Sequence, residues 1–270
     1  MTTRDIQAID VHAHYGVYLR REFPELTNQF ATGDAQTVAQ RAKNNNIKWT
    51  VVSPLLGLLP RGEADAAAGN AEAARVVPET DGLLQWVIID PTQPETYEQA
   101  ARMLAQPHCV GIKIHPEEHV YPIREHGRAI LEFAASHDAV VLTHSGHENS
   151  LPADIVPFAD DYPNVKVILA HIGCSSGSDR TLQVRGIAQS RHGNVYADTS
   201  SAMSITPGLI EWAVSEVGAD RVLFGTDTPL YSTAMQRARI DQADIGDDDK
   251  RMILRENAVA LLALDSSFNP

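Results

Sequence analysis

The sequence predicts an α/β fold, a single (β/α)8 TIM barrel that spans residues 1–270. Three observations predict it: short β-rich runs alternate with helix-like segments, the runs number eight, and most of them are continuously apolar. Alternating strands and helices are typical of a parallel sheet, eight units can close a barrel, and strands buried on both faces are continuously apolar. A doubly wound open sheet is the alternative, although no G-x-G-x-x-G follows the first strand to support its nucleotide-binding form.

The strands are expected at residues 8–14, 48–54, 83–91, 110–116, 139–145, 165–172, 194–200 and 221–227. Helices are expected at residues 34–43, 63–77, 94–105, 123–137, 206–218 and 247–264, with weaker patterns at 152–162 and 180–191. Asp34 can cap the first helix, and Pro94 suits the first turn of the third. The last helix begins with acidic residues, which the helix dipole favours at that end.

The composition limits the classes of function. Hydrophobic residues make up 43% and charged residues 21% of the chain, which is enough to bury a large core. A net charge of −13 argues against nucleic acid and anionic membranes as partners, and leaves a small molecule as the expected substrate. The two cysteines, Cys109 and Cys174, give no disulfide framework, and no apolar run approaches the roughly 20 residues of a membrane span. With no signal-like N-terminus, these features predict a soluble cytoplasmic protein.

Ligand-type side chains stand at the ends of five of the eight expected strands. They are His12 and His14 on the first strand, Lys113 and His115 on the fourth, His144 on the fifth, His171 on the sixth and Asp227 on the eighth. The carboxyl ends of the strands of a TIM barrel meet at one rim, and the chemistry of such barrels is located there. Packing alone does not readily explain this coincidence, so it predicts a functional site.

Strand geometry makes the prediction more specific. Residues two apart point to the same face of a strand, so His12 and His14 should aim together, with Asp10 deeper on that face. Such a pair can bind a divalent ion from one side, and a third imidazole and a carboxylate from other strands would complete the site. Simpler alternatives exist for each residue: a strand-end histidine can be a hydrogen-bonded structural residue, Asp227 can fix a turn, and Lys113 can form an ion pair.

Five motifs in chain order resemble those of the amidohydrolase superfamily. I-D-V-H-A-H is similar to its strand-one metal motif, and G-I-K-I-H-P to a segment of its strand four. L-T-H-S-G and L-A-H-I-G resemble the strand-five and strand-six histidine segments, and L-F-G-T-D-T-P resembles the strand-eight motif. R-E-N-A-V-A-L-L is also similar to the closing helix. More narrowly, nearly the whole chain resembles the group that includes aminocarboxymuconate semialdehyde decarboxylase.

The resemblance implies roles for these residues. His12, His14 and His144 would be metal ligands, and Asp227 would be a ligand that also takes a proton from metal-bound water. His171 would polarise the substrate or act as an acid or base. The group usually holds one metal, for which we expect Zn²⁺, with Mn²⁺, Fe²⁺ and Co²⁺ as alternatives for such ligands. In some relatives a strand-four lysine, modified by carbon dioxide, bridges two metals, so Lys113 is a candidate bridge; otherwise it is not a ligand.

Three functions remain open at this point. We favour a hydrolase that uses a metal-activated water on a small carbonyl compound, an amide, ester or lactone, because the chain is short. A metal-dependent non-oxidative decarboxylase of a small unsaturated or aromatic acid is the alternative, and a non-catalytic binding barrel is the third. Arg20, Arg61 and His115 are candidate substrate contacts; Arg20 lies in a segment, 15–33, that is either a lid or a solvated loop. The resemblance also implies a possible homo-oligomer.

Overall fold

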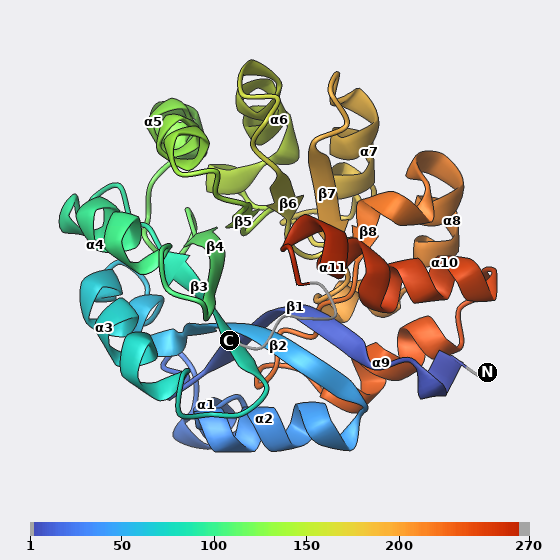
Figure 1. The fold of residues 1–270 in the computed structure, drawn as a ribbon, viewed down its shortest axis with the longest axis horizontal. Coiled ribbons are helices and arrows are strands. Elements are labelled where there is room, and N and C mark those ends of the chain that lie inside the picture. Colours follow the sequence, from blue (N-terminus) through green and yellow to red (C-terminus); the bar gives the residue numbers. More distant parts are fainter. Residues whose placement is uncertain (1–2, 265–270) are drawn as a thin grey trace.

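Eight parallel strands form a barrel, as predicted. The structure is a computed structural model and describes residues 3–264, so residues 1–2 and 265–270 of the expected domain lie outside the described part of the chain. The strands follow one another around the sheet in sequence order, each with a helix or helices after it (Figure 1). They are β1 (Ala8–Tyr15), β2 (Ile47–Pro54), β3 (Leu83–Ile88), β4 (Cys109–Ile114), β5 (Val141–Thr143), β6 (Val167–Leu169), β7 (Val195–Asp198) and β8 (Val222–Leu223).

Backbone hydrogen bonds close the barrel between the segment after β8 and β1. The Val11 amide donates to the Phe224 carbonyl at 2.9 Å, and the Asp227 amide donates to the His12 carbonyl at 2.7 Å. The register of β1 against β2 shifts between Asp10 and Ala13, so β1 is locally bulged. A bulge changes the direction of the side chains that follow it. The seam thus carries the two histidines of β1 and the aspartate that follows β8.

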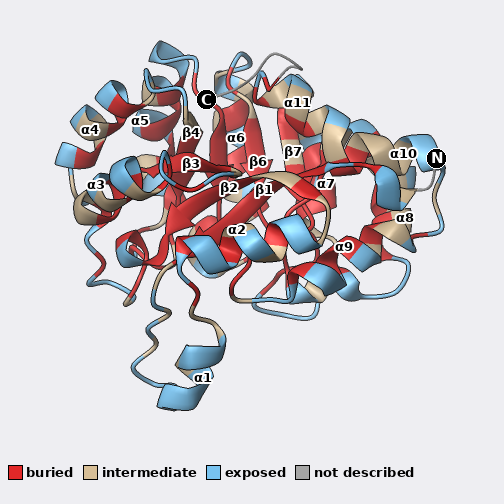
Figure 2. Cartoon of the chain, turned by 60° about the horizontal axis from the view of Figure 1, so that its bottom comes forward, coloured by how far each residue is buried: buried red, intermediate tan, exposed pale blue. Residues whose placement is uncertain are grey.

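The helices surround the barrel, with their exposed faces turned outward (Figure 2). They are α1 (Glu25–Phe30), α2 (Ala35–Asn44), α3 (Ala66–Val76), α4 (Glu95–Met103), α5 (Ile123–Ser136), α6 (Pro152–Asp161), α7 (Leu182–Gln189), α8 (Leu209–Val217), α9 (Thr233–Asp241), α10 (Asp247–Arg251) and α11 (Asn257–Leu261). A π-helical turn, Met252–Glu256, joins the last two within the run expected as one helix. No helix among residues 3–264 combines the length and the apolar character needed to cross a bilayer.

Alternate strand residues belong to two hydrophobic clusters, as expected for strands buried on both faces. Ile112 of β4 and Val141 of β5 pack in one cluster with helix residues such as Ile130 of α5. Trp86 and Leu142 belong to the other cluster, which is built largely from strand residues. The Trp86 indole is fully buried and donates its Nε1–H to the Val11 carbonyl at 2.8 Å. Apolar side chains therefore fill part of the interior, and polar side chains gather at the carboxyl ends of the strands.

The segment between β1 and α2 protrudes from the body of the molecule (Figure 2). Its helix α1 has no buried residue, and Val17, Leu26 and Phe30 expose between 59% and 72% of their surface. The prediction left residues 15–33 as either a lid or a solvated loop. The structure gives this segment a short helix and places it on the rim that carries the histidines.

Candidate metal centre

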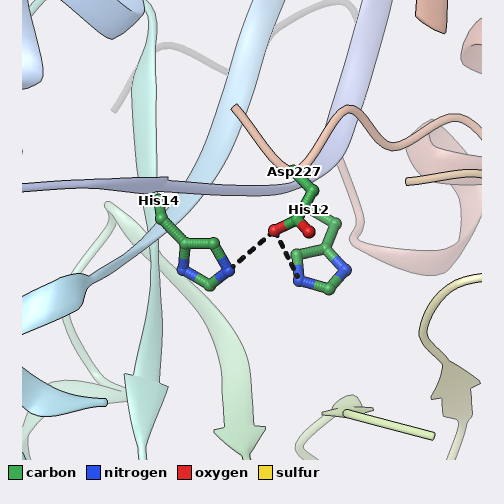
Figure 3. Close-up of side chains that lie close together, drawn as sticks. All are labelled: His12, His14 and Asp227. Carbon is green, nitrogen blue, oxygen red and sulfur yellow. Dashed lines mark ion pairs between the residues drawn. The ribbon is translucent and has the colours of Figure 1, made fainter. Parts of the chain in front are cut away.

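His12, His14 and Asp227 converge at the seam of the barrel (Figure 3). Asp227 Oδ1 lies 3.1 Å from His14 Nε2 and 3.9 Å from His12 Nε2. The three side chains are buried, and their candidate ligand atoms all lie within 4.8 Å of one another. The two histidines come from β1, and Asp227 is held beside them by its backbone hydrogen bond to His12. The structure thus brings these three residues together, and their roles as metal ligands stay predictions.

Hydrogen bonds fix which imidazole nitrogens face the centre. His12 Nδ1 lies 2.8 Å from Asp198 Oδ2, and His14 Nδ1 lies 3.0 Å from the Ser53 carbonyl oxygen. Both partners are acceptors, so we infer that each Nδ1 carries the proton and each Nε2 presents a lone pair. Burial, followed by the charge of Lys113, lowers the pKa of His12 well below its ordinary value, which favours the neutral ring.

Two lone pairs and a carboxylate oxygen thus point at one buried position. Groups of this kind repel one another unless a cation lies between them. Two imidazole nitrogens and one carboxylate oxygen suit zinc, manganese, iron or cobalt in the divalent state. The residues at the seam therefore fit a divalent metal ion.

Lys113 lies inside the barrel against this centre. Its side chain is fully buried, and its Nζ lies 3.0 Å from His12 Nε2, the nitrogen that would bind a metal. Burial lowers the pKa of Lys113 to about 8, while the charges of Asp198 and Asp227 act in the opposite direction. Lys113 thus contacts the centre directly, and its role as a carbon-dioxide-modified bridge between two metals stays a prediction.

The structure adds Asp198, at the end of β7, which the sequence prediction missed. Its Oδ2 accepts from His12, and its Oδ1 accepts from the backbone amides of His171 at 2.9 Å and Ser200 at 3.0 Å. Oxygen and nitrogen atoms of Asp198, His12 and His171 also lie within 4.8 Å of one another. Because the Asp198 carboxylate already serves as acceptor for both residues, we assign it the task of orienting them. The signal was present: Asp198, like Asp227, is a carboxylate at a strand end.

His171 follows β6 and packs its ring against His12, with 4.7 Å between the ring centroids. Ser200 Oγ donates to Asp198 and lies 2.7 Å from His171 Nδ1, so it can accept the proton of that nitrogen. This arrangement leaves a lone pair on His171 Nε2. Burial lowers the pKa of His171 to about 3, so the ring is neutral near pH 7.

Two of the site residues have left-handed backbone conformations. The φ angles are +72° at His171 and +55° at Asp227. Such a conformation costs a non-glycine residue about 1–2 kcal/mol, and it persists where surrounding contacts hold it. Here the holding contacts are the hydrogen bonds from the two backbone amides to Asp198 and to the His12 carbonyl. The fold therefore tolerates backbone strain at His171 and Asp227, and this strain directs the two side chains toward the site.

His144 lies on the same rim, next to two further histidines. Its ring stacks on His115 at 4.3 Å with 10° between the planes, and its Nε2 lies 2.8 Å from His147 Nδ1. Burial lowers the pKa of both His115 and His144 well below the ordinary value. Among the described residues, neither converging group of ligand atoms includes His144. His147 was not singled out from the sequence, since it follows a turn rather than a strand.

A cavity of about 270 Å³ opens above these residues, and His14, His115, His144, His171 and Asp227 line it. Arg20 and Arg61 also line the cavity, and both contact Glu118. Arg61 Nη2 lies 3.1 Å from Glu118 Oε1 and its side chain is half exposed, whereas Arg20 is mostly buried. Two guanidinium groups share one carboxylate, so this part of the cavity has a surplus positive charge.

The fold and this site define a barrel with a His/Asp metal centre at the carboxyl ends of its strands. Comparison with known proteins identifies the family: a family model described as amidohydrolase matches residues 9–264. The chain therefore belongs to the amidohydrolase family, as the motifs predicted.

Solved structures with the same fold include three decarboxylases. A 2,6-dihydroxybenzoate decarboxylase complexed with 2,6-dihydroxybenzoate is 15% identical, with a TM-score of 0.74 and coverage of 97% of this chain and 100% of that one. A 5-carboxyvanillate decarboxylase from Novosphingobium aromaticivorans, complexed with manganese and 4-hydroxy-3-methoxy-5-nitrobenzoic acid, is 14% identical, with a TM-score of 0.72 and coverage of 97% and 99%. A dihydroxybenzoic acid decarboxylase from Polaromonas, with manganese and 2-nitroresorcinol, is 16% identical, with a TM-score of 0.69 and coverage of 95% and 97%.

Proposed function

We propose that this protein is a metal-dependent, non-oxidative decarboxylase of small aromatic acids that carry a hydroxyl group beside the carboxylate. The observation that carries the proposal is the placement of Asp227 and neutral His171 in a cavity with a positively charged part. An acid with an adjacent hydroxyl matches such a cavity in charge and in hydrogen-bonding groups. The similar decarboxylase structures support this choice of substrate class.

The proposed metal ligands are His12, His14 and Asp227, with His144 as a further candidate. When bound, a divalent ion would supply a Lewis acid that holds and polarises the oxygens of the substrate. Zinc was expected from the sequence, whereas the manganese in two similar structures supports manganese for this chain. Metal content per chain, measured by elemental analysis of gently purified protein beside His12→Ala, identifies the ion and tests the one-metal reading against a Lys113 bridge.

The chain's own residues perform the proton transfers in this proposal. His171 lines the cavity as a neutral ring and orients the substrate. Asp227 takes the hydroxyl proton and delivers it to the ring carbon that bears the carboxylate. The bond from that carbon to the carboxylate then breaks and carbon dioxide leaves. The electron pair of the broken bond stays with the ring and restores its aromaticity. A proton from water returns to the phenolate oxygen, so the net change is one proton taken up for one carbon dioxide released.

Arg61 is proposed as the anion contact at the mouth of the cavity. Its guanidinium is half exposed and shares Glu118 with Arg20, so it can exchange part of that contact for a substrate carboxylate. Arg20 then holds Glu118 in place, and His115 forms part of the cavity wall. We expect Arg61→Met to raise KM for an acidic substrate by about tenfold, because a charged hydrogen bond contributes ~1.5–3 kcal/mol. A KM unchanged in steady-state kinetics would remove Arg61 from this role.

The hydrolase that the short chain favoured is supported only at the level of the superfamily. Three similar solved structures are decarboxylases, which favours the decarboxylase over the hydrolase. Incubation in D₂O with a panel of hydroxybenzoates decides between them. We expect stoichiometric carbon dioxide and one deuterium on the ring carbon that lost the carboxylate.

Other results of this panel would support the competing functions. Addition of water across an amide, ester or lactone without carbon dioxide would establish the hydrolase. Binding without turnover, unchanged by His12→Ala, would establish a non-catalytic barrel. The expected cytoplasmic location and homo-oligomer stay predictions; fractionation and light scattering test them.

A further inference from the structure

The turn after β5 places His147 beside His144. In H-S-G-H, residues 144–147, Gly146 has a φ of +102°, and a Cβ on it would lie 2.2 Å from the Cys174 carbonyl oxygen. Only glycine fits this close, left-handed turn. The turn is also held by a hydrogen bond from the Gly146 amide to the Ser150 carbonyl at 3.0 Å. As a result the rings of His144 and His147 lie 4.9 Å apart and nearly parallel.

The two rings share one hydrogen bond, and one nitrogen is left over. His144 Nε2 and His147 Nδ1 are 2.8 Å apart, so one of them donates to the other. The Cys174 thiol is a more distant neighbour of the same His147 nitrogen, at 3.9 Å. His144 Nδ1 is buried and has no hydrogen-bond partner within residues 3–264. A buried polar atom without a partner needs an explanation, and a role in binding a cation is one.

The tautomer of His144 decides what its buried Nδ1 can do. If Nδ1 carried the proton, a buried N–H would lack an acceptor, and Nε2 would have to accept from His147. If Nε2 carries the proton and donates to His147, then Nδ1 keeps a buried lone pair without a hydrogen-bond partner among the described residues. Only the second arrangement lets His144 bind a cation.

We propose that His147 is a positioning residue. It accepts a hydrogen bond from the Nε2–H of His144, which leaves the lone pair of His144 Nδ1 free to bind a metal ion. The inference rests on the proposed metal-dependent function. Like the two histidines of β1, His144 would then donate from one ring nitrogen and keep a lone pair on the other, although the nitrogens are exchanged: His12 donates its Nδ1–H to Asp198 and His14 donates its Nδ1–H to the Ser53 carbonyl. Such partners fix the tautomer and the ring orientation of a ligand, and their loss typically lowers metal affinity about 10–100-fold.

Two variants and one control test this role. In His147→Asn the amide oxygen takes the place of Nδ1 and can still accept from His144, whereas His147→Leu has no acceptor. His192, an exposed loop residue, provides the control His192→Leu. We expect Mn²⁺ and Zn²⁺ affinity, measured by competition with a chelator, to fall about 10–100-fold in His147→Leu and to recover within about threefold of the wild type in His147→Asn.

The tautomer itself provides a readout that does not depend on the metal. Long-range ¹H–¹⁵N spectra of the metal-free wild type, assigned with His144→Gln, should show the His144 proton on Nε2. A proton on Nδ1 would overturn the inference, as would wild-type metal affinity in His147→Leu. Failure of the proposed function gives a different result, because the wild type itself would then bind neither ion.

Discussion

Replacement of Asp198 by asparagine exchanges one carboxylate oxygen for an NH₂ group. It should weaken His12 as a proposed metal ligand, because it changes which ring nitrogen of His12 carries the proton. Asp198 Oδ2 accepts the Nδ1 proton of His12, and Oδ1 accepts from the amides of His171 and Ser200. An asparagine can keep its oxygen on the two amides, which places its NH₂ group against His12. In that arrangement the NH₂ group donates to Nδ1 of His12, and the imidazole proton moves to Nε2. The lone pair that faces Asp227 is lost.

The expected loss of metal affinity follows from the contacts around His12. Loss of a partner that orients a ligand lowers metal affinity about 10–100-fold, or ~1.4–2.7 kcal/mol. Ser200 Oγ lies 3.1 Å from the same His12 nitrogen and can accept its proton in place of Asp198. We therefore expect the lower end, about tenfold, for Asp198→Asn and the upper end for Asp198→Asn combined with Ser200→Ala. The assay is metal titration of the stripped protein against a competing chelator, with thermal unfolding to establish that the variants fold.

Asp90→Asn is the matched control. Asp90 is also a buried carboxylate, and it accepts from the Thr92 amide and from the Gln93 side chain, away from His12. Its variant should keep wild-type metal affinity even if it loses stability. Equal affinity of Asp198→Asn and the wild type would refute the reasoning, because the His12 tautomer would then not depend on Asp198.

Three further changes have defined outcomes. Asp227→Asn should lower kcat for carbon dioxide release about 10²–10⁴-fold while the protein still binds metal, since the variant cannot transfer a proton; near-native turnover would remove Asp227 from its assigned role. Burial raises the pKa of Asp10 from 3.8 to about 8, so its contribution to stability is present below pH 3.8 and is lost as the pH rises toward 8. The unfolding free energy of the metal-free wild type relative to Asp10→Asn should therefore fall across this range by up to ~1.4 kcal/mol per pH unit in urea titrations, and a flat difference would contradict the shift. Gly111→Ala would place a Cβ 2.5 Å from the Trp86 ring and should cost ~1–3 kcal/mol in the same titrations, whereas Gly177→Ala, with open space around it, should cost little.

The order of strands and helices was predictable because hydrophobic periodicity is a local property of the chain. The strand expected at 48–54 is found at Ile47–Pro54, and the helix expected at 123–137 is found at Ile123–Ser136. Helix α9 was not predicted, since three of its four buried residues are Thr233, Gln236 and Arg237. Arg237 is buried by tertiary contacts: it forms an ion pair with Asp241 and donates to the Thr3 carbonyl. No apolar repeat indicates such a helix.

The residues that converge at the centre were predictable from their positions at strand ends, but their hydrogen-bond partners were less so. His12, His14 and Asp227 stand where a barrel must bring them together. Asp198 carried the same signal, yet its contact with His12 depends on how β7 and β1 are placed on either side of β8. The contact of His147 with His144 depends on a left-handed turn at Gly146, which sequence spacing does not fix. The sequence thus indicates which elements carry the candidate ligands, and the structure shows that His12 and His14 turn their Nε2 atoms toward Asp227.

Closure of the barrel and assembly of the site depend on the same hydrogen bonds. The Thr226 amide and hydroxyl form hydrogen bonds with the Asp10 carboxyl group at 3.0 and 2.6 Å, across 216 residues of sequence. The His12 amide donates to the same carboxyl group at 3.1 Å. Asp10 therefore holds the backbone of His12 and the residue before Asp227 through one carboxyl group. A cation between His12 and Asp227 would join the two sides of this seam again at the next layer, so metal binding and the stability of the closed barrel are coupled.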